Sequence, residues 1–468
     1  MATLRMPLPE QPRNETILAR LDRLPTTRYI WTLVALLSLG GIFEFYDLFM
    51  TAYVVPGLVK AGILAGVGFS IFRGPALFVA ATFGGLFIGT CIFGYVADRY
   101  GRRAIFTFSM LWYSAATLIM AFQSTGMLVS LWRLIAGIGI GVELVTIDTY
   151  IAELVPKQVR GRVFAFNQFV QYLVVPVVAL AAYLLVPRNP LGLNGWRWVV
   201  LLGSAGALFV WFIRRRVPES PRWLINQGRL DEAEAITENI EARVRADLGG
   251  ARLPRPAPHA VEEEKPGSFR EIWQPPYTRR TLMMMVFQFF QTFGYYGFAA
   301  WVPTLIARQI GINLGASLLF SFIIAIANPF GPLVAMGFAD RFERKWQLVG
   351  AACCIAVFGL LFAAQRTIPL LILFGVLFTL SNNVMSYAFH SYQSELFPTR
   401  IRARAVGFTY SFSRISTVFA SFIIGFFLQA GGTKAVFSLI AFAMLMVVLS
   451  IGIFGPRTRA LELEEIAY

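Results

Sequence analysis

"GYVADRYGRR", residues 94–103, is a charged stretch between two long apolar segments, and a changed copy, "GFADRFERK", occupies residues 337–345. Its Asp-Arg-Tyr core at 98–100 returns as Asp-Arg-Phe at 340–342, an offset of 242 residues. A second motif repeats at the same offset, where Tyr150, Glu153, Pro156, Arg160 and Arg162 match Tyr392, Glu395, Pro398, Arg402 and Arg404. Two motifs in one register indicate two related halves, an organisation common among membrane transporters.

Composition places the chain in a membrane. Of its 468 residues 57% are hydrophobic and 14% are charged, whereas a soluble protein carries about a quarter charged residues. Apolar runs of about 20 residues recur along the chain, each long enough to cross a ~30 Å hydrocarbon layer. The net charge of +15 is explained by the enrichment of Lys and Arg in cytoplasmic loops, so we expect no nucleic-acid partner.

We therefore predict an all-α membrane protein with twelve transmembrane helices in two six-helix pseudo-symmetric bundles. In the first half the spans are 29–54, 76–97, 104–122, 127–152, 163–186 and 196–213. In the second half they are 281–306, 316–338, 347–365, 369–393, 405–428 and 435–454.

The predicted domains follow from these spans. A cytoplasmic N-terminus (1–28) precedes the first bundle (29–213), a cytoplasmic linker (214–280) leads to the second (281–454), and a cytoplasmic tail (455–468) follows. In the linker we expect a helix over 230–246 and a flexible Pro-rich run over 254–266. The basic residues predict a multi-pass plasma (inner) membrane protein with both termini cytoplasmic. We also expect a monomer in the lipid bilayer. The outer loops then hold only Lys60, Arg73, Arg188, Arg197, Arg308, Arg366 and Lys434.

Other classes of function lack their motifs. No Gly-rich phosphate loop, catalytic triad or metal-ligand cluster is visible in the sequence, so we expect no enzyme, no metal and no cofactor. Cys91, Cys353 and Cys354 lie in or beside apolar segments, where buried small side chains are the expected interpretation.

Ionisable residues inside the predicted spans are functional candidates, because charge at membrane depth is costly. Counting ~1.5 Å per helical residue puts Asp47 ~27 Å and Arg133 ~31 Å from the cytoplasmic ends of their helices. The two therefore share a depth, and we predict an ion pair that couples transport to a proton. A static structural pair is the alternative.

Glu44 lies one helical turn from Asp47, and Glu143 follows the small-residue run "GIGIG" (137–141). We predict that both acids bind a proton. For Glu143 two alternatives remain: it could bind a donor group of the substrate, or it could hydrogen-bond to a neighbouring helix.

Arg414 is the outstanding charge of the second half, ~15 Å deep and so near the bilayer midplane. Its guanidinium is suited to binding a carboxylate through two hydrogen bonds. Three interpretations remain open: a substrate anion, an ion pair within the protein, and a side chain that reaches the membrane surface.

Polar and aromatic side chains at one depth predict a cavity lining, although any one Asn or Gln is more often a helix-to-helix contact. The predicted substrate-binding set, with Arg414, is Gln288, Gln291, Tyr295, Tyr296, Asn328, Asn382, Asn383, Gln168 and Gln171. Trp301 and Tyr410 offer further stacking faces beside this cavity.

Taken together, these motifs resemble the major facilitator superfamily over the full length of the chain. "GYVADRYGRR" is similar to that family's loop between helices two and three, and "ELVPKQVRGR" (153–162) to its loop after helix four. "PESPRWL" (218–224) and the tail "GPRTRALELEEI" (455–466) resemble the sugar-porter branch and its organic-ion and niacin relatives. The resemblance implies alternating access, with a gate formed by Asp98, Arg99, Arg102, Arg103, Glu153, Arg160, Arg162, Asp340, Arg341, Arg344, Glu395, Arg402 and Arg404.

Departures from the sugar-porter pattern bear on the substrate. The Gly-x-Asn of helix seven is missing from "FQFFQTFGYYGFAAWVPTLI", and Arg457 stands where a sugar porter usually has Glu. "FEFYDLF" (43–49) instead resembles the acid-x-x-acid pattern of aromatic-acid, niacin and phosphate proton symporters. We therefore expect a symporter of a small organic solute, a carboxylate or aromatic organic anion, driven by a proton gradient. The alternatives are a sugar or polyol symporter, a passive uniporter, and a nutrient sensor without transport.

Overall fold

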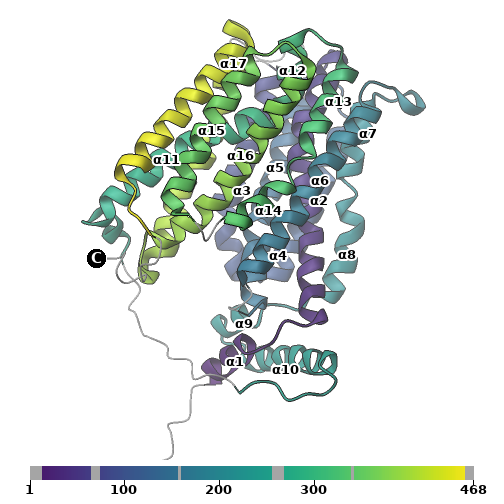
Figure 1. The fold of residues 1–468 in the computed structure, drawn as a ribbon. Helices are drawn as coiled ribbons and strands as arrows, with labels where there is room; N and C mark the ends of the chain where they lie inside the picture. Colours follow the sequence, from purple (N-terminus) through teal and green to yellow (C-terminus); the bar gives the residue numbers. More distant parts are fainter. Residues whose placement is uncertain (1–12, 65–73, 157–159, 256–267, 339–341, 459–468) are drawn as a thin grey trace, which may run out of the picture.

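The computed structural model describes residues 13–64, 74–156, 160–255, 268–338 and 342–458, and the described chain is predominantly helical (Figure 1). Nine of the described helices are long and apolar enough to cross a membrane. One of these, α17 (Thr399–Phe454), holds two spans, because Gly432 adopts a positive φ of 66° and kinks it. One of the nine, over 314–334, runs across a break between two helices, and two further spans, over 195–216 and 277–310, are each divided between two helices. The prediction of a twelve-helix membrane fold is therefore confirmed.

The first half contains six spans. They are α2 (Arg28–Lys60), α3 (Gly74–Tyr100), α4 (Arg102–Ala121), α5 (Gly126–Leu154), α6 (Arg160–Leu185) and the broken pair α7 (Gly195–Gly203) and α8 (Gly206–Arg216). Helix α5 begins where the Thr125 hydroxyl accepts a hydrogen bond from the Leu128 amide, a typical N-cap. A 3-10 turn, Pro190–Gly192, precedes α7.

The second half repeats this order. Its spans are the pair α11 (Tyr277–Ala299) and α12 (Val302–Ile310), the pair α13 (Leu314–Ala325) and α14 (Phe330–Phe338), α15 (Arg344–Ala364), α16 (Ile368–Glu395) and the two parts of α17. Pro329 lies in the break between α13 and α14, where its missing N–H prevents a continuous helix. The other break, at Ala300 and Trp301, precedes Pro303 at the start of α12.

Short helices gather at one end of the bundle, the end that the basic residues predict to be cytoplasmic (Figure 1). They are α1 (Arg13–Asp22), α9 (Pro221–Asn226) and α10 (Leu230–Asp247), together with a 3-10 helix at Phe269–Trp273. The linker helix that the sequence predicts over 230–246 is α10. Most of the predicted flexible run over 254–266 lies outside the described residues. We call this the predicted cytoplasmic end, and the end with α12 the predicted outer end.

Glycines of the "GIGIG" run allow two helices of the first half to touch. A Cβ on Gly85 of α3 would lie 2.2 Å from the Leu134 carbonyl oxygen of α5, and one on Gly141 would lie 2.4 Å from the Leu86 carbonyl oxygen. Side chains larger than hydrogen would force these backbones apart. Close packing of α3 on α5 fixes the position of Arg133, which α5 carries. Between the halves, α3 packs on α17 and α6 packs on α13.

Candidate functional site

Asp47 of α2 and Arg133 of α5 form an ion pair with no exposed surface on either side chain. The Arg133 Nη1 atom donates to Asp47 Oδ2 at 2.7 Å, and Nη2 donates to the Asp47 carbonyl at 2.7 Å. Thr82 accepts from Arg133 Nε at 2.9 Å, and Thr117 donates to Asp47 Oδ1 at 3.0 Å. Every charged atom of the acid therefore has a hydrogen-bond partner, as a buried ion pair requires.

Glu44 has the opposite environment, one turn along α2. Its side chain is fully buried, and neither carboxyl oxygen has a hydrogen-bond partner among the described residues. Glu143 of α5 is also fully buried, and Ser109 donates to its Oε2 atom at 3.4 Å while Oε1 has no described partner. Burying an ionised carboxylate without donors is costly, so both groups are suited to holding a proton. The charged groups that act on Glu44 are Glu143, Asp148 and Arg414.

Arg414 of α17 is buried at 8% exposure, yet no Asp or Glu among the described residues forms an ion pair with it. Its Nη2 atom donates to the Tyr410 hydroxyl at 3.3 Å, and its guanidinium lies 4.9 Å from the centre of the Tyr410 ring. Tyr296 of α11 is a further hydrogen-bond partner, while Nε has none that the structure describes. A buried cation that lacks a carboxylate partner is available to an anion.

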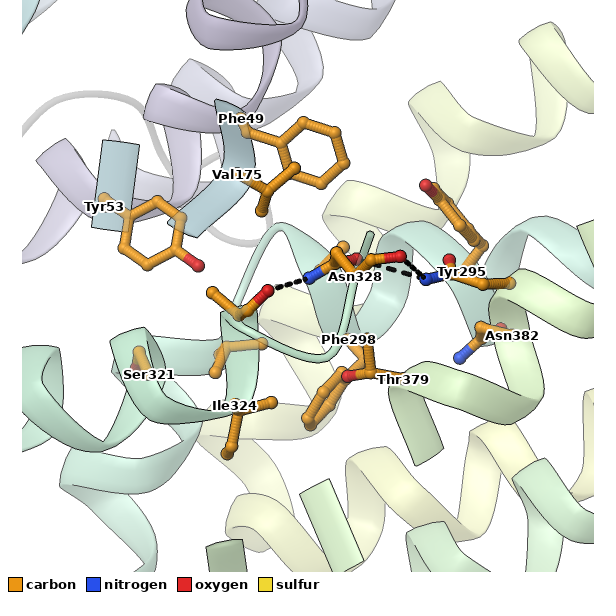
Figure 2. A pocket seen from close by; sticks show the side chains of 14 residues that line it. Phe49, Tyr53, Val175, Tyr295, Phe298, Ser321, Ile324, Asn328, Thr379 and Asn382 are labelled. Carbon is orange, nitrogen blue, oxygen red and sulfur yellow. Dashed lines mark hydrogen bonds between the residues drawn. The ribbon is translucent and has the colours of Figure 1, made fainter. Parts of the chain in front are cut away.

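A small cavity lies between the halves, with about 30 Å³ of open space, enough for one or two water molecules. Figure 2 shows Asn328 at its centre, with Phe49 and Tyr53 of α2 to one side and Tyr295 of α11 to the other. Asn383 donates to the Asn328 carbonyl at 3.1 Å. Buried Oδ1 atoms of Asn382 and Asn383 lack described hydrogen-bond partners, so they are free acceptors. The lining of this central cavity includes Tyr295, Asn328, Asn382 and Asn383 from the predicted binding set.

Gln288 and Gln291 of α11 do not line the central cavity. Gln291 donates to the Gln288 side chain at 3.3 Å, and Gln288 donates to Gln393 of α16 at 3.1 Å. This chain of amides joins two helices of the second half. Gln171 packs against Gly41, and Gln168 is a hydrogen-bond partner of Tyr172. Trp301 lies outside the central cavity as well. Shared depth alone therefore grouped side chains with different neighbours.

Tyr172 is a residue of the site that the sequence did not reveal. Its hydroxyl lies 2.7 Å from the Tyr295 hydroxyl, so one donates to the other across the boundary between α6 and α11. Phe45 packs edge-on against the Tyr172 ring, with centroids 5.7 Å apart. In a sequence, a tyrosine in an apolar helix is indistinguishable from any other core aromatic residue, so no signal identified this contact.

The predicted gate contains two equivalent ion pairs at the predicted cytoplasmic end. Arg102 of α4 pairs with Glu153 of α5 at 3.0 Å, and Arg344 of α15 pairs with Glu395 of α16 at 2.6 Å. Both residues of one pair are displaced by 242 positions from those of the other. Each pair joins two helices of the same half, so neither pair bridges the halves.

The remaining gate residues have separate surroundings. Arg99, Arg162 and Arg404 are exposed, the Arg103 amide donates to Glu219 at 3.2 Å, and Arg402 Nε donates to the Phe397 carbonyl at 3.1 Å. The side chains of Asp98 and Arg160, and all of Asp340 and Arg341, lie outside the described part of the structure.

The two copies of the opening motif turn differently. Gly101 has a positive φ of 95°, and a Cβ there would lie 2.6 Å from Glu219, whose carboxylate accepts from the Arg102 and Arg103 amides. Its counterpart Glu343 has an ordinary φ of −57°, and its own carboxylate accepts from the Thr458 amide at 2.8 Å. An acid from the linker therefore caps the first turn, whereas Glu343 in the second motif binds an amide of the tail and does not cap its own helix.

The three cysteines differ from expectation. All are exposed on the isolated chain, because a membrane protein turns apolar side chains outward as well as inward.

Within the described residues, no group of three or more His, Cys, Asp or Glu side chains is placed to hold a metal ion.

Comparisons with known proteins agree with this architecture. The family model for sugar (and other) transporters matches residues 33–468. The chain is similar to the niacin transporter NiaP of Acinetobacter baylyi, with 29% identity over 96% of this chain and 99% of NiaP. Its fold resembles the partially occluded inward open conformation of the xylose transporter XylE from E. coli, with a TM-score of 0.75 and 22% identity over 93% of this chain and 99% of that one. A crystal structure of a D-xylose-proton symporter is similar too, with a TM-score of 0.69 and 22% identity over 92% of this chain and 99% of that one.

Proposed function

The chain belongs to the sugar (and other) transporter family, and from this premise we propose that it is a proton-coupled symporter of a small organic carboxylate. The family consists of transporters, so the chain is a transporter and not an enzyme. We place it in the plasma (inner) membrane as a monomer with both termini in the cytoplasm, as its basic residues predict. Its driving ion is the proton, and it needs no cofactor.

Arg414 is the observation that carries the choice of substrate. A cation at this depth is costly unless an anion or polar groups compensate its charge. Tyr410 and Tyr296 are the hydrogen-bond partners of Arg414, and no described carboxylate forms an ion pair with it, although the charge of Glu44 acts on it. A substrate carboxylate would therefore complete the site. The Tyr410 and Tyr296 rings favour a substrate that carries an aromatic ring next to its carboxylate. The relative NiaP is named a niacin transporter, and niacin is an aromatic carboxylic acid.

The proton is assigned to the buried acids of the first half. Asp47 is held by Arg133, so protonation of Asp47 would release a cation and change how α2 packs on α5. Glu44 lies on the same helix face and is influenced by the charge of Arg414. A proton on Glu44 and an anion on Arg414 would therefore act on each other through charge, which links the driving ion to the substrate.

A sugar or polyol is the second candidate, favoured by the lining of the central cavity. Asn328, Asn382, Asn383, Ser321 and Thr379 present amides and hydroxyls there, which are groups that hydrogen-bond sugar hydroxyls. The structural neighbour XylE is named a xylose transporter. Among the described residues, this lining includes no charged side chain, whereas Arg414 offers a charge that a neutral sugar would not use.

Uptake into proteoliposomes tests the proposal. With an imposed inward proton gradient, we expect accumulation of a labelled aromatic carboxylate such as nicotinate or benzoate, and none of xylose or glucose. Arg414→Gln should abolish this uptake and the thermal stabilisation that the acid gives to the purified protein, while Arg414→Lys should retain part of both. Carboxylate binding that survives in Arg414→Gln would overturn the assignment, and accumulation of sugars alone would establish the second candidate. Uptake that only equilibrates would indicate a passive uniporter, and binding without uptake a sensor.

A further inference from the structure

A second cavity, of about 450 Å³, lies at the predicted outer end of the molecule. Both halves line it: Pro56 and Lys60 of α2 and Pro75 of α3 from the first half, and Thr304 and Arg308 of α12 and Leu428 of α17 from the second. We call it the outer vestibule. Its volume falls in the range of small-molecule sites, about 300–1,000 Å³, whereas the central cavity has room for only one or two waters.

The vestibule combines apolar walls with positive charge. Lys60 and Arg308 are its only charged lining residues among those described, and no acidic residue accompanies them. Lys60 Nζ donates to the Pro187 carbonyl at 3.1 Å, which leaves two of the three N–H groups of the ammonium available. Arg308 is exposed. A cleft with low-dielectric walls and charges of one sign concentrates the opposite ion.

Trp301 belongs to the vestibule lining, although residues on either side of it in sequence line the central cavity. It lies in the break between α11 and α12, lines the vestibule, and is buried at 3% exposure. Its neighbours in sequence, Ala299 and Val302, line the central cavity instead. Residues close together in the α11–α12 break therefore line the two cavities, Trp301 the vestibule and Ala299 and Val302 the central cavity.

We propose that the outer vestibule is a first binding site for an organic anion with an apolar ring, which occupies it before reaching Arg414. Lys60 and Arg308 recognise the carboxylate, and the proline, leucine and tryptophan side chains contact the ring. This inference rests on the proposed function for the class of substrate. It assigns that substrate a second position with its own two cations.

Thiol labelling tests the vestibule without any need for transport. Thr304→Cys places a thiol in the cavity of the full-length protein in nanodiscs, and the unsubstituted chain gives the background from its native cysteines. Ala307→Cys, in the same lining, is the second probe if the first protein fails to fold. We expect benzoate to slow labelling by an impermeant thiol reagent by about threefold or more, and benzamide to leave it unchanged, since focusing of anions by such a cleft reaches tenfold and above.

Charge removal gives the matched comparison. Lys60→Gln with Arg308→Gln should abolish the protection by benzoate and lower the labelling rate of a sulfonate reagent relative to a trimethylammonium reagent by about tenfold. Lys434→Gln, at another exposed outer cation, should change neither. Equal protection by benzamide, or protection that persists without both cations, would overturn the inference. Loss of labelling in phosphatidylglycerol nanodiscs without benzoate would also overturn it, because a lipid would then be the occupant.

The same labelling separates this inference from the proposed function. In Arg414→Gln the vestibule should still be protected by benzoate, although uptake is lost. If the unaltered protein transports carboxylates but benzoate gives no protection, the inference fails and the proposed function stands. If benzoate protects the thiol but no carboxylate is transported in any gradient, the vestibule remains an anion site and the proposed function fails.

Discussion

Asp47 and Arg133 form a fully buried ion pair. The pair has two possible roles, one structural and one in proton coupling, and experiment can separate them. A structural pair stabilises the fold through mutual compensation of charge, whereas a coupling pair must also exchange a proton during transport. Removing one partner of a buried pair costs about 3–5 kcal/mol, because the other charge is left uncompensated. Replacing both partners with neutral side chains of similar shape removes that penalty.

We predict that Asp47→Asn destabilises the protein by about 3–5 kcal/mol and that adding Arg133→Gln restores most of the loss. Thermal unfolding of the purified variants measures this. If Asp47 carries the coupling proton, the double variant should have lost gradient-driven accumulation while it retains counterflow exchange. Full accumulation in the stable double variant would show that the pair is only structural.

Glu44 gives a second prediction at the same scale. Because no described group donates to its carboxyl oxygens, the neutral amide of Glu44→Gln should fit without loss of stability. We expect this variant to fold normally and to lose the dependence of uptake rate on external pH. Glu232→Gln, at an exposed position of α10, is the control and should behave like the unaltered protein. An unchanged pH profile in Glu44→Gln would remove Glu44 from the coupling path.

The depth of a residue along its helix predicts some contacts of the site and not others. Helical depth brought Asp47 and Arg133 together because both lie on spans whose ends are well marked by charge. The same counting grouped Gln288 with Asn328, although Gln288 is bonded to Gln393 and Asn328 lines the central cavity. Depth fixes the height of a side chain but not the helix face or the neighbour that it meets. Nor does depth predict the role of Tyr172, because a tyrosine in an apolar helix resembles any other core aromatic residue until its neighbour, Tyr295, is known.

At the scale of elements, apolar length and the flanking charges predicted the spans, and Pro329 and Pro303 account for breaks that length alone does not reveal. Helix α1 was not foreseen, because residues 1–28 read only as a polar terminus. Contacts with residues more than 200 positions away hold this helix in place. Arg20 and Arg23 both donate hydrogen bonds to Glu241 of α10, at 2.7 and 2.5 Å. Ile17 of α1 packs against Trp223 and Leu224. Long-range ion pairs of this kind leave no periodic signal.

The contact between α1 and α10 should respond to acid. Burial favours the neutral form of Glu241, but hydrogen bonds and charges from Arg20 and Arg23 outweigh it and hold the pKa of Glu241 below its ordinary value. A lowered pKa contributes stability that is present above the unfolded value, about 4.3, and is lost as the pH falls through the folded pKa. We therefore expect α1 to stay attached at neutral pH and to separate from α10 as the pH falls through the lowered pKa of Glu241.

Spin labels on the exposed faces of α1 and α10 would report this separation as a longer and broader distance distribution. Glu241→Gln should produce the same change at pH 7, because it removes the negative charge that both arginines pair with and one of the two oxygen acceptors. The control is Glu232→Gln, which breaks only the exposed pair with Arg229, and such surface pairs contribute little. A distance that does not change in Glu241→Gln would show that the other contacts of α1 hold it without Glu241: the apolar contact of Ile17 and the ion pairs of Arg20 with Glu234 and of Asp22 with Arg222.

At the scale of the whole molecule, the repeat at an offset of 242 predicted two halves, and the ion pairs Arg102–Glu153 and Arg344–Glu395 show that the repeat extends to side-chain contacts. What the repeat could not predict is how the halves meet. Motifs repeated in sequence describe contacts within a half, whereas the boundary between the halves is formed by residues outside these motifs. Tyr172 with Tyr295, and Phe83 with Tyr296 at 4.7 Å between ring centres, are contacts of this second kind.

The hydrogen bond between Tyr172 and Tyr295 joins the halves beside the central cavity, so rocking of the halves has to break it. A bond of this kind contributes about 0.5–1.5 kcal/mol, and Tyr295→Phe should therefore shift the population away from this conformation by about two- to tenfold. Tyr46→Phe is the matched control, because the Tyr46 hydroxyl donates to Val199 at 3.0 Å within one half. Spin labels at the exposed positions Leu191 and Lys434, one on each half, measure the population by their distance distribution. A new distance in Tyr295→Phe, absent in Tyr46→Phe, is the expected result; identical distributions in both would mean that the packing of α3 on α17 and of α6 on α13 sets the conformation without this bond.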